Sequence, residues 1–418
     1  MSLSRLMLAA SLLALSLPAA AQTPEETAAA ALEAAPVWDG HNDVPEQLRG
    51  RYHDVLADFD FTDTSNAPSN GWSEGGMHTD LPRLRQGHVG AQFWSVYVSA
   101  GLEDNAATVE VLEQIDVTKR LIARNSDDMA LATSADEVEA AMAQGKIASL
   151  MGMEGGYAIS DSLGVLRQFY ALGARYMTLT HSAQMSWADS ATAAPQHDGL
   201  TDFGVKVVEE MNRLGMLVDL SHTSEATMND ALDVAKAPVI FSHSGARAVN
   251  GHARNVPDAV LARLKDNGGI VMVVALPNYI SEELRVYDAA HAAEQARLES
   301  LWRGQPDAVA AGMAQWESEN PAPKATVSDM ADHIDHIRDV AGIDHIGLGG
   351  DYDGMATGPV GMEDVAGYPA LFVELARRGY SQEDLEKIAS RNMMRVLRAA
   401  EAYAASVADM PPIETPVD

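Results

Sequence analysis

Short apolar runs recur along the chain, and longer stretches with apolar residues at every third or fourth position lie between them. A short apolar run is typical of a buried strand, and the wider spacing is typical of a helix with one buried face. Strands are predicted at residues 36–38, 91–98, 147–153, 175–180, 216–220, 239–242, 269–275 and 345–348. Helices are predicted between them, for example at residues 109–123, 163–172, 203–214 and 257–265.

The alternation of eight strands with helices is the repeat of a closed parallel barrel. The predicted fold class is therefore α/β, a TIM-type (β/α)8 barrel in a single domain at residues 22–405. Barrels of this kind accommodate several hundred residues in one domain, so the length of 418 residues does not require a second. An open, doubly wound sheet is the alternative, but no glycine-rich phosphate loop follows the first strand.

Two segments depart from the repeat. Residues 49–85 are rich in Asp, Ser, Asn and Gly, and we expect an excursion after the first strand there. Residues 282–324 have helical periodicity and form an insertion between the seventh and eighth strands. An insertion at that place falls at the carboxyl end of the barrel, where it would either cover an active site or form a simple helical hairpin.

The first 21 residues have the three parts of a secretory leader. Arg5 gives a positive start, residues 6–17 form an apolar run too short to span a bilayer, and residues 18–21 provide a small-residue cleavage site. No later apolar run reaches about 20 residues, so we expect no transmembrane segment. The last segment, residues 406–418, is predicted as a polar tail that contains proline.

The charge balance limits the class of partner. The chain has 29 Lys and Arg against 60 Asp and Glu, a formal net charge of −31, which would repel nucleic acid and anionic membranes. A small molecule or a peptide is therefore the expected partner. Because there is no cysteine, disulfides and thiolate metal ligands are excluded. Export without disulfides favours a periplasmic or secreted bacterial protein.

Two of the predicted strands lead into a histidine, and a helix capped by Ser224 is predicted between them. His222 follows the strand at residues 216–220, and His243 follows the strand at residues 239–242. Parallel strands joined by a helix have their carboxyl ends at the same edge of the sheet, so the two side chains should emerge together. Two neutral imidazoles suit a divalent metal ion, and two histidines hydrogen-bonded to loops are the alternative.

Four other predicted strands also lead into His, Asp or Glu. His41 and Asp43 follow the first strand, and their spacing of two puts them on one side of an extended chain. Glu154 follows the third strand, His181 the fourth and Asp351 the eighth. Polar residues at this end of barrel strands are typical of a catalytic site.

The predicted ligand set contains imidazoles and carboxylates but no thiolate. It consists of His41, Asp43, Glu154, His222 and His243. Such a set suits two divalent ions that share a carboxylate, with zinc as the leading candidate and manganese, cobalt or iron as alternatives. A paired-metal centre would bridge a water molecule, lower its pKa and hold it as the nucleophile of a hydrolysis.

Eight motifs resemble those of the membrane dipeptidase family, also called renal dipeptidases. They are GHND at residues 40–43, QFWSVY at 92–97, EGG at 154–156, LTHS at 179–182, WAD at 187–189, FSHS at 241–244, RNVP at 254–257 and GGDYDG at 349–354. The resemblance runs in order from about residue 35 to about residue 400, apart from the insertion. It implies a distorted eight-stranded barrel with a binuclear zinc site that cleaves dipeptides, including dehydropeptides. Some members also open carbapenem rings.

Carried over position by position, the resemblance implies a role for each ligand. His41 and Asp43 would bind one zinc ion, His222 and His243 the other, and Glu154 would bridge both. The resemblance also implies a homodimer, which without cysteine would contain no disulfide.

Four further residues would contact the substrate if the resemblance holds. His181 would polarise the scissile carbonyl or stabilise its oxyanion, and Arg254 would pair with the terminal carboxylate. Asp351 would assist proton transfer and face the substrate amine, and Tyr279 occupies the place of a substrate-contacting tyrosine. Residues 275–277 depart from the polar, aromatic segment of the mammalian enzymes, which leaves the side-chain preference open. The residues alone also allow a surface role for Arg254 and a turn role for Asp351.

Two other functions remain as alternatives. A metal-dependent deacylase of N-acyl amino acids, or a lactamase, would use the same centre without a free substrate amine. A catalytically silent binding protein would not need the whole ligand set. The other nine histidines have no such placement, and we expect them to be solvent or packing residues; they are His53, His78, His88, His197, His252, His291, His333, His336 and His345.

Overall fold

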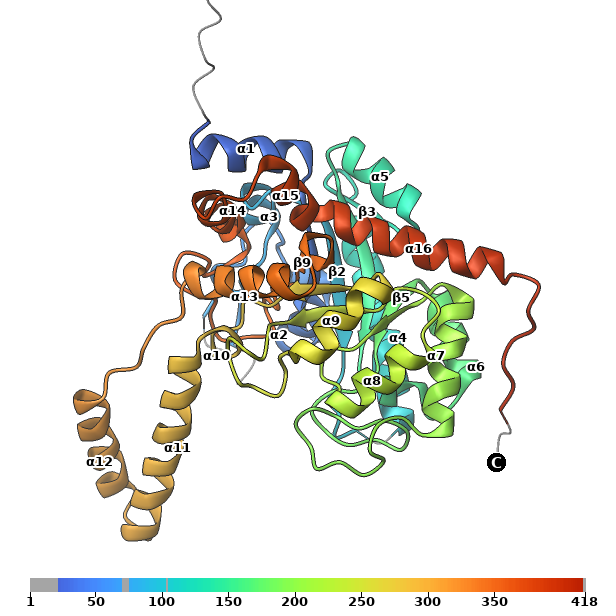
Figure 1. Cartoon of the computed structure of the whole chain (residues 1–418). Helices are drawn as coiled ribbons and strands as arrows, with labels where there is room; N and C mark the ends of the chain where they lie inside the picture. The colour runs from blue at the N-terminus through green and yellow to red at the C-terminus, as the bar shows by residue number, and fades with distance from the viewer. Residues whose placement is uncertain (1–21, 70–74, 103, 416–418) are drawn as a thin grey trace, which may run out of the picture.

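A computed structural model describes residues 22–69, 75–102 and 104–415, so the predicted leader and the last three residues of the tail lie outside the described residues. Eight parallel strands form a closed barrel surrounded by helices (Figure 1). The strands are β1 Val37–Asn42, β2 Val89–Tyr97, β4 Ile147–Glu154, β5 Ala174–Thr178, β6 Leu217–Asp219, β7 Ile240–Ser244, β8 Ile270–Val273 and β9 Ile346–Leu348. All eight predicted strands are present, and the prediction of a TIM-type barrel is confirmed.

The barrel closes between β2 and β4, which pair from Ala91 with Ala148 to Tyr97 with Glu154. A ninth strand, β3 at Met129–Leu131, pairs with the beginning of β4 on its other side. The strand β3 was not predicted because it has three residues and its last side chain, Leu131, is exposed. Further along β4, β5 takes the place of β3 as the neighbouring strand. The region between β2 and β4 therefore departs from the regular alternation of strand and helix.

The helices form the outer layer, and polar residues begin many of them. The helices around the barrel are α1 Pro24–Ala34, α2 Val44–Tyr52, α3 Leu81–Gln86, α4 Asp104–Arg124, α5 Ala135–Ala143, α6 Leu163–Ala171, α7 Asp202–Leu214, α8 Glu225–Val234, α9 Asp258–Asn267, α10 Pro277–Ile280, α13 Val327–Val340, α14 Tyr368–Arg377, α15 Gln382–Glu386 and α16 Asn392–Ser406. Shorter helical turns lie at Leu56–Asp58, Gly156–Ile159, Ile343–His345, Val365–Gly367 and Lys387–Arg391. The four helices named from periodicity are confirmed, and the Ser224 hydroxyl caps α8 by accepting from the Thr227 amide at 3.1 Å.

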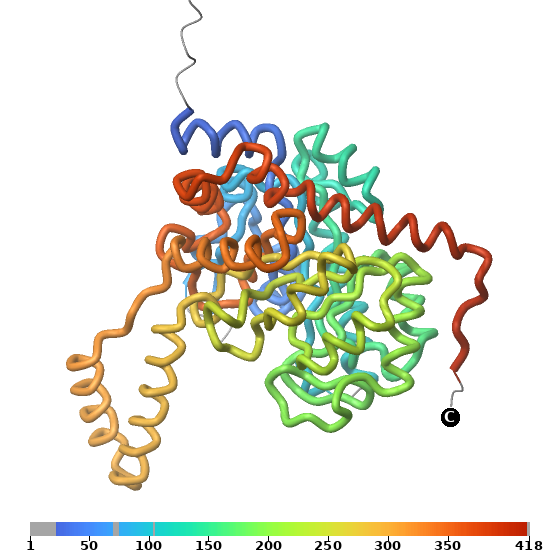
Figure 2. Tube along the Cα trace, viewed as in Figure 1, coloured from blue at the N-terminus to red at the C-terminus, as the bar shows by residue number. Residues whose placement is uncertain are grey.

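The insertion between β8 and β9 is a pair of helices, α11 at Glu282–Leu301 and α12 at Pro306–Glu319. The hairpin projects away from the barrel, as the orange segment of Figures 1 and 2 shows. Within it, only Leu298 and Met313 are buried side chains. No residue of the hairpin lines the cavity described below, so the structure favours the simple hairpin over a cover for that cavity.

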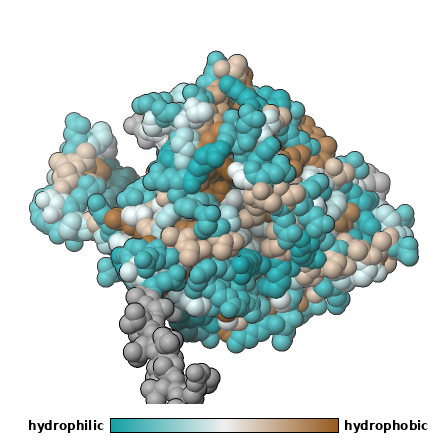
Figure 3. Space-filling view, turned by 90° about the horizontal axis from the view of Figure 1, so that it is seen from above, coloured by the Kyte–Doolittle hydropathy of each residue, from teal (hydrophilic) through white to brown (hydrophobic). Residues whose placement is uncertain are grey.

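The described part of residues 49–85 packs onto the barrel through the buried rings of Phe59 and Phe61. Hydrophilic side chains cover most of the molecular face shown in Figure 3. Among the described helices, none combines the length and the apolar character that crossing a bilayer requires.

His333 shows how a buried polar group is satisfied in the outer layer. It lies on α13 with no exposed surface, accepts from the Ala246 amide through Nδ1 at 2.8 Å, and donates from Nε2 to the Ile280 carbonyl at 3.1 Å. Burial lowers the pKa of His333 to about 4. Its neutral form is therefore the one that the folded protein holds.

The low pKa of His333 predicts a loss of stability in acid. Below the ordinary histidine pKa of about 6.5 the unfolded chain binds a proton that the folded protein refuses, so the free energy of unfolding falls from there down to about pH 4. We expect the low pKa of His333 to decrease the free energy of unfolding by about 2 kcal/mol between pH 7 and pH 5. Urea unfolding in the presence of chelator, for the wild type and His333→Gln, measures this. If the free energy of unfolding fell equally in both proteins between pH 7 and pH 5, the prediction would be wrong.

Candidate metal centre and active site

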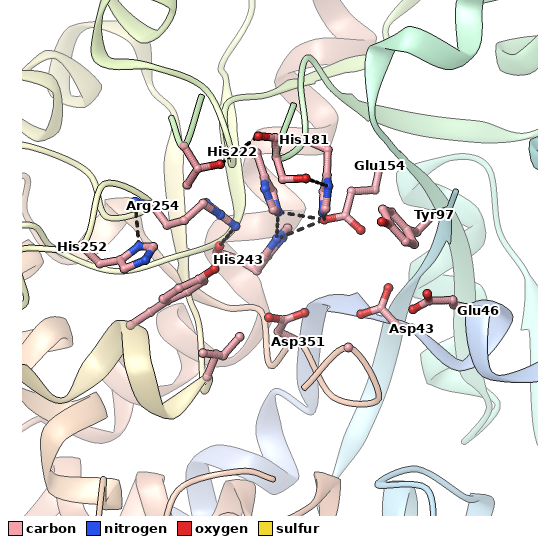
Figure 4. Close-up of a pocket in the computed structure, with 15 residues that line it drawn as sticks. Asp43, Glu46, Tyr97, Glu154, His181, His222, His243, His252, Arg254 and Asp351 are labelled. Carbon is pink, nitrogen blue, oxygen red and sulfur yellow. Dashed lines mark hydrogen bonds and ion pairs between the residues drawn. The ribbon is translucent and has the colours of Figure 1, made fainter. Parts of the chain in front are cut away.

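A cavity of about 490 Å³ opens at the carboxyl ends of the barrel strands. Eight of the predicted site residues line it: Asp43, Glu154, His181, His222, His243, Arg254, Tyr279 and Asp351. The ninth, His41, is fully buried, within 3.4 Å of Glu154. The structure therefore brings all the predicted site residues together, and Figure 4 shows those that line the cavity.

Glu154 lies at the centre of the cluster, and its two oxygens face two different pairs of side chains. Oε1 is 3.0 Å from Nε2 of His222 and 3.3 Å from Nε2 of His243. Oε2 is 3.4 Å from Nε2 of His41, which is itself 3.4 Å from Oδ1 of Asp43. The ligand atoms of each of three triads lie within 4.8 Å of one another. One triad is Glu154, His222 and His243, another is His41, Asp43 and Glu154, and the third is His41, His243 and Asp351.

Unusual backbone conformations help to aim these side chains. His222 and Asp351 have φ angles of 64° and 62°, in the left-handed region that residues with a Cβ rarely adopt. Such strain persists where surrounding contacts hold it, and it is concentrated at functional sites. The Asp351 amide donates to the His41 carbonyl at 3.1 Å, and the Asp43 amide donates to the Tyr352 carbonyl at 2.9 Å. These bonds tie the loop after β9 to the end of β1.

Tyr176 orients His41 from across the barrel interior. Its hydroxyl lies 2.9 Å from Nδ1 of His41 and donates to the Gly40 carbonyl at 3.3 Å. The hydroxyl therefore accepts from Nδ1–H, so Nε2 is the ring nitrogen of His41 that faces Glu154. Gly152 makes room for this arrangement, because a Cβ there would overlap the ring of Tyr176.

A similar chain stands behind His243. Ser242 Oγ lies 2.8 Å from Nδ1 of His243 and donates to Oδ2 of Asp219 at 2.6 Å. Asp219 also accepts from the amides of Ser221 and Ser242, so its carboxylate is fixed. His243 consequently holds its proton on Nδ1 and presents Nε2 to Glu154. Hydrogen bonds of this kind behind a ligand fix its tautomer and orientation.

Asp39 is a buried carboxyl group that the sequence analysis did not single out. It accepts from the His41 amide at 3.1 Å, from the Gly350 amide at 2.8 Å and from the Tyr368 hydroxyl at 2.8 Å. Burial raises the pKa of Asp39 to about 6. Its bonds join the ends of β1 and β9, which carry His41 and Asp351. A carboxylate inside an apolar strand was the signal that could have marked it.

The cluster has the chemistry of a divalent metal site. Among the described residues, His41 Nε2 and Asp43 Oδ2 are buried without a hydrogen-bond partner. Nε2 of His222 and Nε2 of His243 are 3.0 Å apart beside the same oxygen of Glu154. Burial holds the pKa of both histidines well below the ordinary value, so both are neutral, as metal binding requires. These observations fit a pair of divalent cations held on either side of Glu154.

Arg254 stands at one end of the cavity and is buried, so the alternative of a surface arginine is wrong. It donates from Nη1 to Ser244 Oγ at 3.3 Å and from Nη2 to the His243 carbonyl at 3.1 Å. Its Nε has no partner among the described residues. The guanidinium lies 5.4 Å from the centre of the Tyr279 ring, which holds it against the wall of the cavity.

His252 lies on the same wall, although we expected it among the solvent and packing histidines. Its ring is 4.4 Å from that of Tyr279, and its Nδ1 accepts from the Arg254 amide at 3.1 Å. The expectation failed because His252 is on a loop, where no strand end marked it. Its place could have been inferred from its position two residues before Arg254.

The other end of the cavity contains Tyr97, His181 and Glu46. The His181 ring lies 4.2 Å from that of His222 and 4.7 Å from that of Tyr97, and its Nε2 is 3.8 Å from Oε1 of Glu154. Burial lowers the pKa of His181, so its neutral form is favoured. No role was predicted for Tyr97 or Glu46, although Tyr97 ends a strand and Glu46 comes three residues after Asp43.

Two carboxyl groups of the cavity are hard to ionise while the cluster holds no cation. Burial and the charge of Asp43 raise the pKa of Asp351 well above its ordinary value. Burial, together with Asp43, Glu154 and Asp351, raises the pKa of Glu46 to about 8. Gly354 lets the loop after β9 approach the carboxyl groups of Asp43 and Asp351, because a Cβ at this position would overlap Asp43 and crowd Asp351.

Comparison with known sequences places this arrangement in a family. The sequence profile of the membrane dipeptidase family, peptidase family M19, matches residues 25–410. Dipeptidase 3 of Macaca fascicularis is 42% identical over 371 residues, which are 88% of this chain and 65% of that protein. Dipeptidase 3 of Homo sapiens is 41% identical over 392 residues, 93% of this chain and 70% of that protein. The chain thus spans about two thirds of the length of these relatives.

Solved structures share the fold. A probable dipeptidase from Pseudomonas aeruginosa superimposes with a TM-score of 0.75 at 22% identity and covers 91% of this chain and 99% of that one. A metallopeptidase from Rhodobacter sphaeroides, solved with a phosphinate mimic of the dipeptide L-Ala-D-Ala, has a TM-score of 0.71 at 24% identity. That match covers 88% of this chain and 99% of the other.

The bond between Tyr176 and His41 predicts an effect on metal affinity. Tyr176→Phe removes the hydroxyl that accepts from Nδ1 and should weaken metal binding about 10- to 100-fold without unfolding the barrel. Competition with a chromophoric chelator measures the change. Tyr170→Phe, on α6 beside Arg175, is the matched control and should bind metal as the wild type does. Equal affinities in all three proteins would show that the hydroxyl has no part in the site.

Proposed function

Because this chain belongs to the membrane dipeptidase family, peptidase family M19, we propose that it is a metal-dependent dipeptidase. The observation that carries the proposal is the placement of two ligand pairs against opposite oxygens of Glu154. The same cavity contains a buried guanidinium, which suits the carboxylate that ends a dipeptide. A hydrolytic centre next to a carboxylate site favours substrates that are cut one residue from the carboxyl end.

We propose a binuclear zinc centre, in which His41 and Asp43 hold one ion, His222 and His243 hold the other, and Glu154 bridges them. The nitrogen and oxygen donors and the neutral imidazoles support this assignment, and manganese, cobalt or iron would fit the same donors. When bound, the ions would polarise the scissile carbonyl and lower the pKa of a water molecule.

The surrounding side chains would divide the remaining work. The Nη1 and Nη2 groups of Arg254 would receive the terminal carboxylate as a planar fork and fix the position of the scissile bond. His181, whose Nε2 is 3.8 Å from Oε1 of Glu154, would donate a hydrogen bond to the oxygen on which negative charge develops. Asp351 would hold the substrate amine and accept the proton released by the attacking water. It would then pass that proton to the nitrogen of the broken peptide bond.

We also propose that residues 1–21 direct export and that the mature protein acts in the periplasm or outside the cell. The charged start, the short apolar run and the small-residue site support this. A homodimer without disulfides stays a prediction of the family resemblance.

The proposed metal centre predicts that metal and activity are lost together. The purified protein should contain close to two divalent ions and cleave dipeptides with a free amino end, and chelation should abolish that cleavage. His222→Ala should lose metal and at least about 100-fold in kcat/KM, because both polarising effects depend on the ions. Elemental analysis and a dipeptide panel measure these outcomes.

His291→Ala is the control, because His291 pairs with Glu317 in the projecting hairpin, away from the cavity. It should retain metal and activity. Full metal content and full activity in His222→Ala would refute the site. Cleavage of N-acylated substrates alone would establish a deacylase instead.

If Arg254 binds the terminal carboxylate of the substrate, removing the guanidinium or removing the carboxylate should lower kcat/KM by a similar factor. Arg254→Ala should keep its metal but lose about 10- to 100-fold in kcat/KM for a dipeptide, mainly through KM. Amidation of the terminal carboxylate should cost the wild type a similar factor and cost the variant little more. An equal loss on the dipeptide and on its amide after the substitution would show that Arg254 supports the structure instead.

A further inference from the structure

The cavity has basic side chains at one end and carboxyl groups at the other. Arg254 and His252 lie at one end, and Glu46 lies at the other, beside Asp43 and Tyr97, with Glu154 between the two ends (Figure 4). If Arg254 receives the terminal carboxylate and the scissile bond lies at Glu154, the amino-terminal residue of the dipeptide extends towards Glu46. This reasoning rests on the function proposed above.

The position of Glu46 is fixed by the helix that carries it. Glu46 is in the first turn of α2, between the buried residues Pro45 and Gln47. The side-chain Nε2 of Gln47 donates to the Asp353 carbonyl at 2.6 Å, and Nε of Arg51 donates to Oε1 of Gln47 at 2.5 Å. This first turn is anchored to the loop after β9, so the Glu46 side chain starts from a rigid base.

The Glu46 carboxyl group has no bonding partner in the described part of the chain. It forms no hydrogen bond and no ion pair with any residue in the described part of the chain, and it is absent from the three groups that could hold a metal ion. Its charged surroundings are the carboxyl groups of Asp43, Glu154 and Asp351, together with His41. Asp43 and Glu154 are assigned to the metal ions and Asp351 to the substrate amine, which leaves Glu46 as a carboxyl group that faces the cavity without a partner in the described part of the chain.

We propose that Glu46 binds the cationic side chain of the amino-terminal residue, so that the enzyme prefers dipeptides that begin with lysine or arginine. A carboxylate that faces an enclosed cavity gains a charge-assisted hydrogen bond when an ammonium or guanidinium group enters. The cation in turn favours the ionised form of Glu46. The ring of Tyr97 offers an apolar face for the alkyl stem of such a side chain and a π face for its charge.

A matched substrate pair tests the proposal. Lys-Ala and norleucine-Ala have side chains of similar length and differ in the terminal ammonium group. The wild type should show a kcat/KM at least about tenfold higher for Lys-Ala, which corresponds to about 1.4 kcal/mol. In Glu46→Gln the ratio of the two substrates should fall to about 1. Glu33→Gln removes an exposed carboxylate from α1, far from the cavity, and should keep the wild-type ratio.

Charge reversal gives a second test that does not depend on the first variant. Glu46→Lys should prefer Glu-Ala over Lys-Ala and so invert the wild-type order. An unchanged Lys-Ala to norleucine-Ala ratio in Glu46→Gln would overturn the proposal. So would an equal loss on both substrates, because Glu46 would then hold the amine common to all dipeptides or support the metal ligands.

The same measurements distinguish a failure of the role proposed for Glu46 from a failure of the dipeptidase proposal. Cleavage of norleucine-Ala by the wild type without a preference for Lys-Ala would overturn the role of Glu46 and leave the dipeptidase proposal standing. Failure to cleave either dipeptide by the metal-loaded wild type would overturn the function itself, and the role of Glu46 with it.

Discussion

The burial of one carboxylate among imidazoles is the constraint on which the site depends. Glu154 is almost inaccessible, and burial alone would oppose its ionisation. The charge of His41 outweighs that cost and holds the pKa of Glu154 well below its ordinary value. The arrangement is stable only if the imidazoles keep fixed orientations, because an unpaired buried charge is strongly destabilising. A change in the orientation of one histidine would therefore destabilise the whole cluster around Glu154.

The interior of the barrel supplies those orientations. Tyr176 reaches His41 across the space that Gly152 leaves, and Asp219 reaches His243 through the hydroxyl of Ser242. A barrel interior is normally packed with branched apolar side chains. Here polar groups occupy part of it, and each of these pairs ends on a side chain that faces Glu154. The polar interior is thus explained by the needs of the site at its carboxyl end.

How far the sequence could predict this structure depended on the range of the interactions involved. Strands and their terminal residues were predictable because the pattern that marks them is local, which is why His222 and His243 were placed correctly together. The strand at Met129–Leu131 was too short to form such a pattern. Glu46 and His252 were missed because they come from a helix turn and a loop, and only the closed barrel brings these segments to the cavity wall. Asp39 has the same origin, since its partners at Gly350 and Tyr368 are at the other end of the chain.

The side chains around Glu154 are far apart in the sequence. His41 and Asp43 lie near the amino terminus, and His222 and His243 lie past the middle of the chain. The chain has no cysteine, so no covalent bond closes the intervening segments into loops. An ion bound by side chains so distant in sequence would close those loops and lower the entropy of the unfolded chain, as a disulfide does. In this protein a catalytic centre would then also act as a reversible cross-link between early and late parts of the polypeptide. The stability of the protein would then depend on the supply of metal rather than on the redox potential of its surroundings.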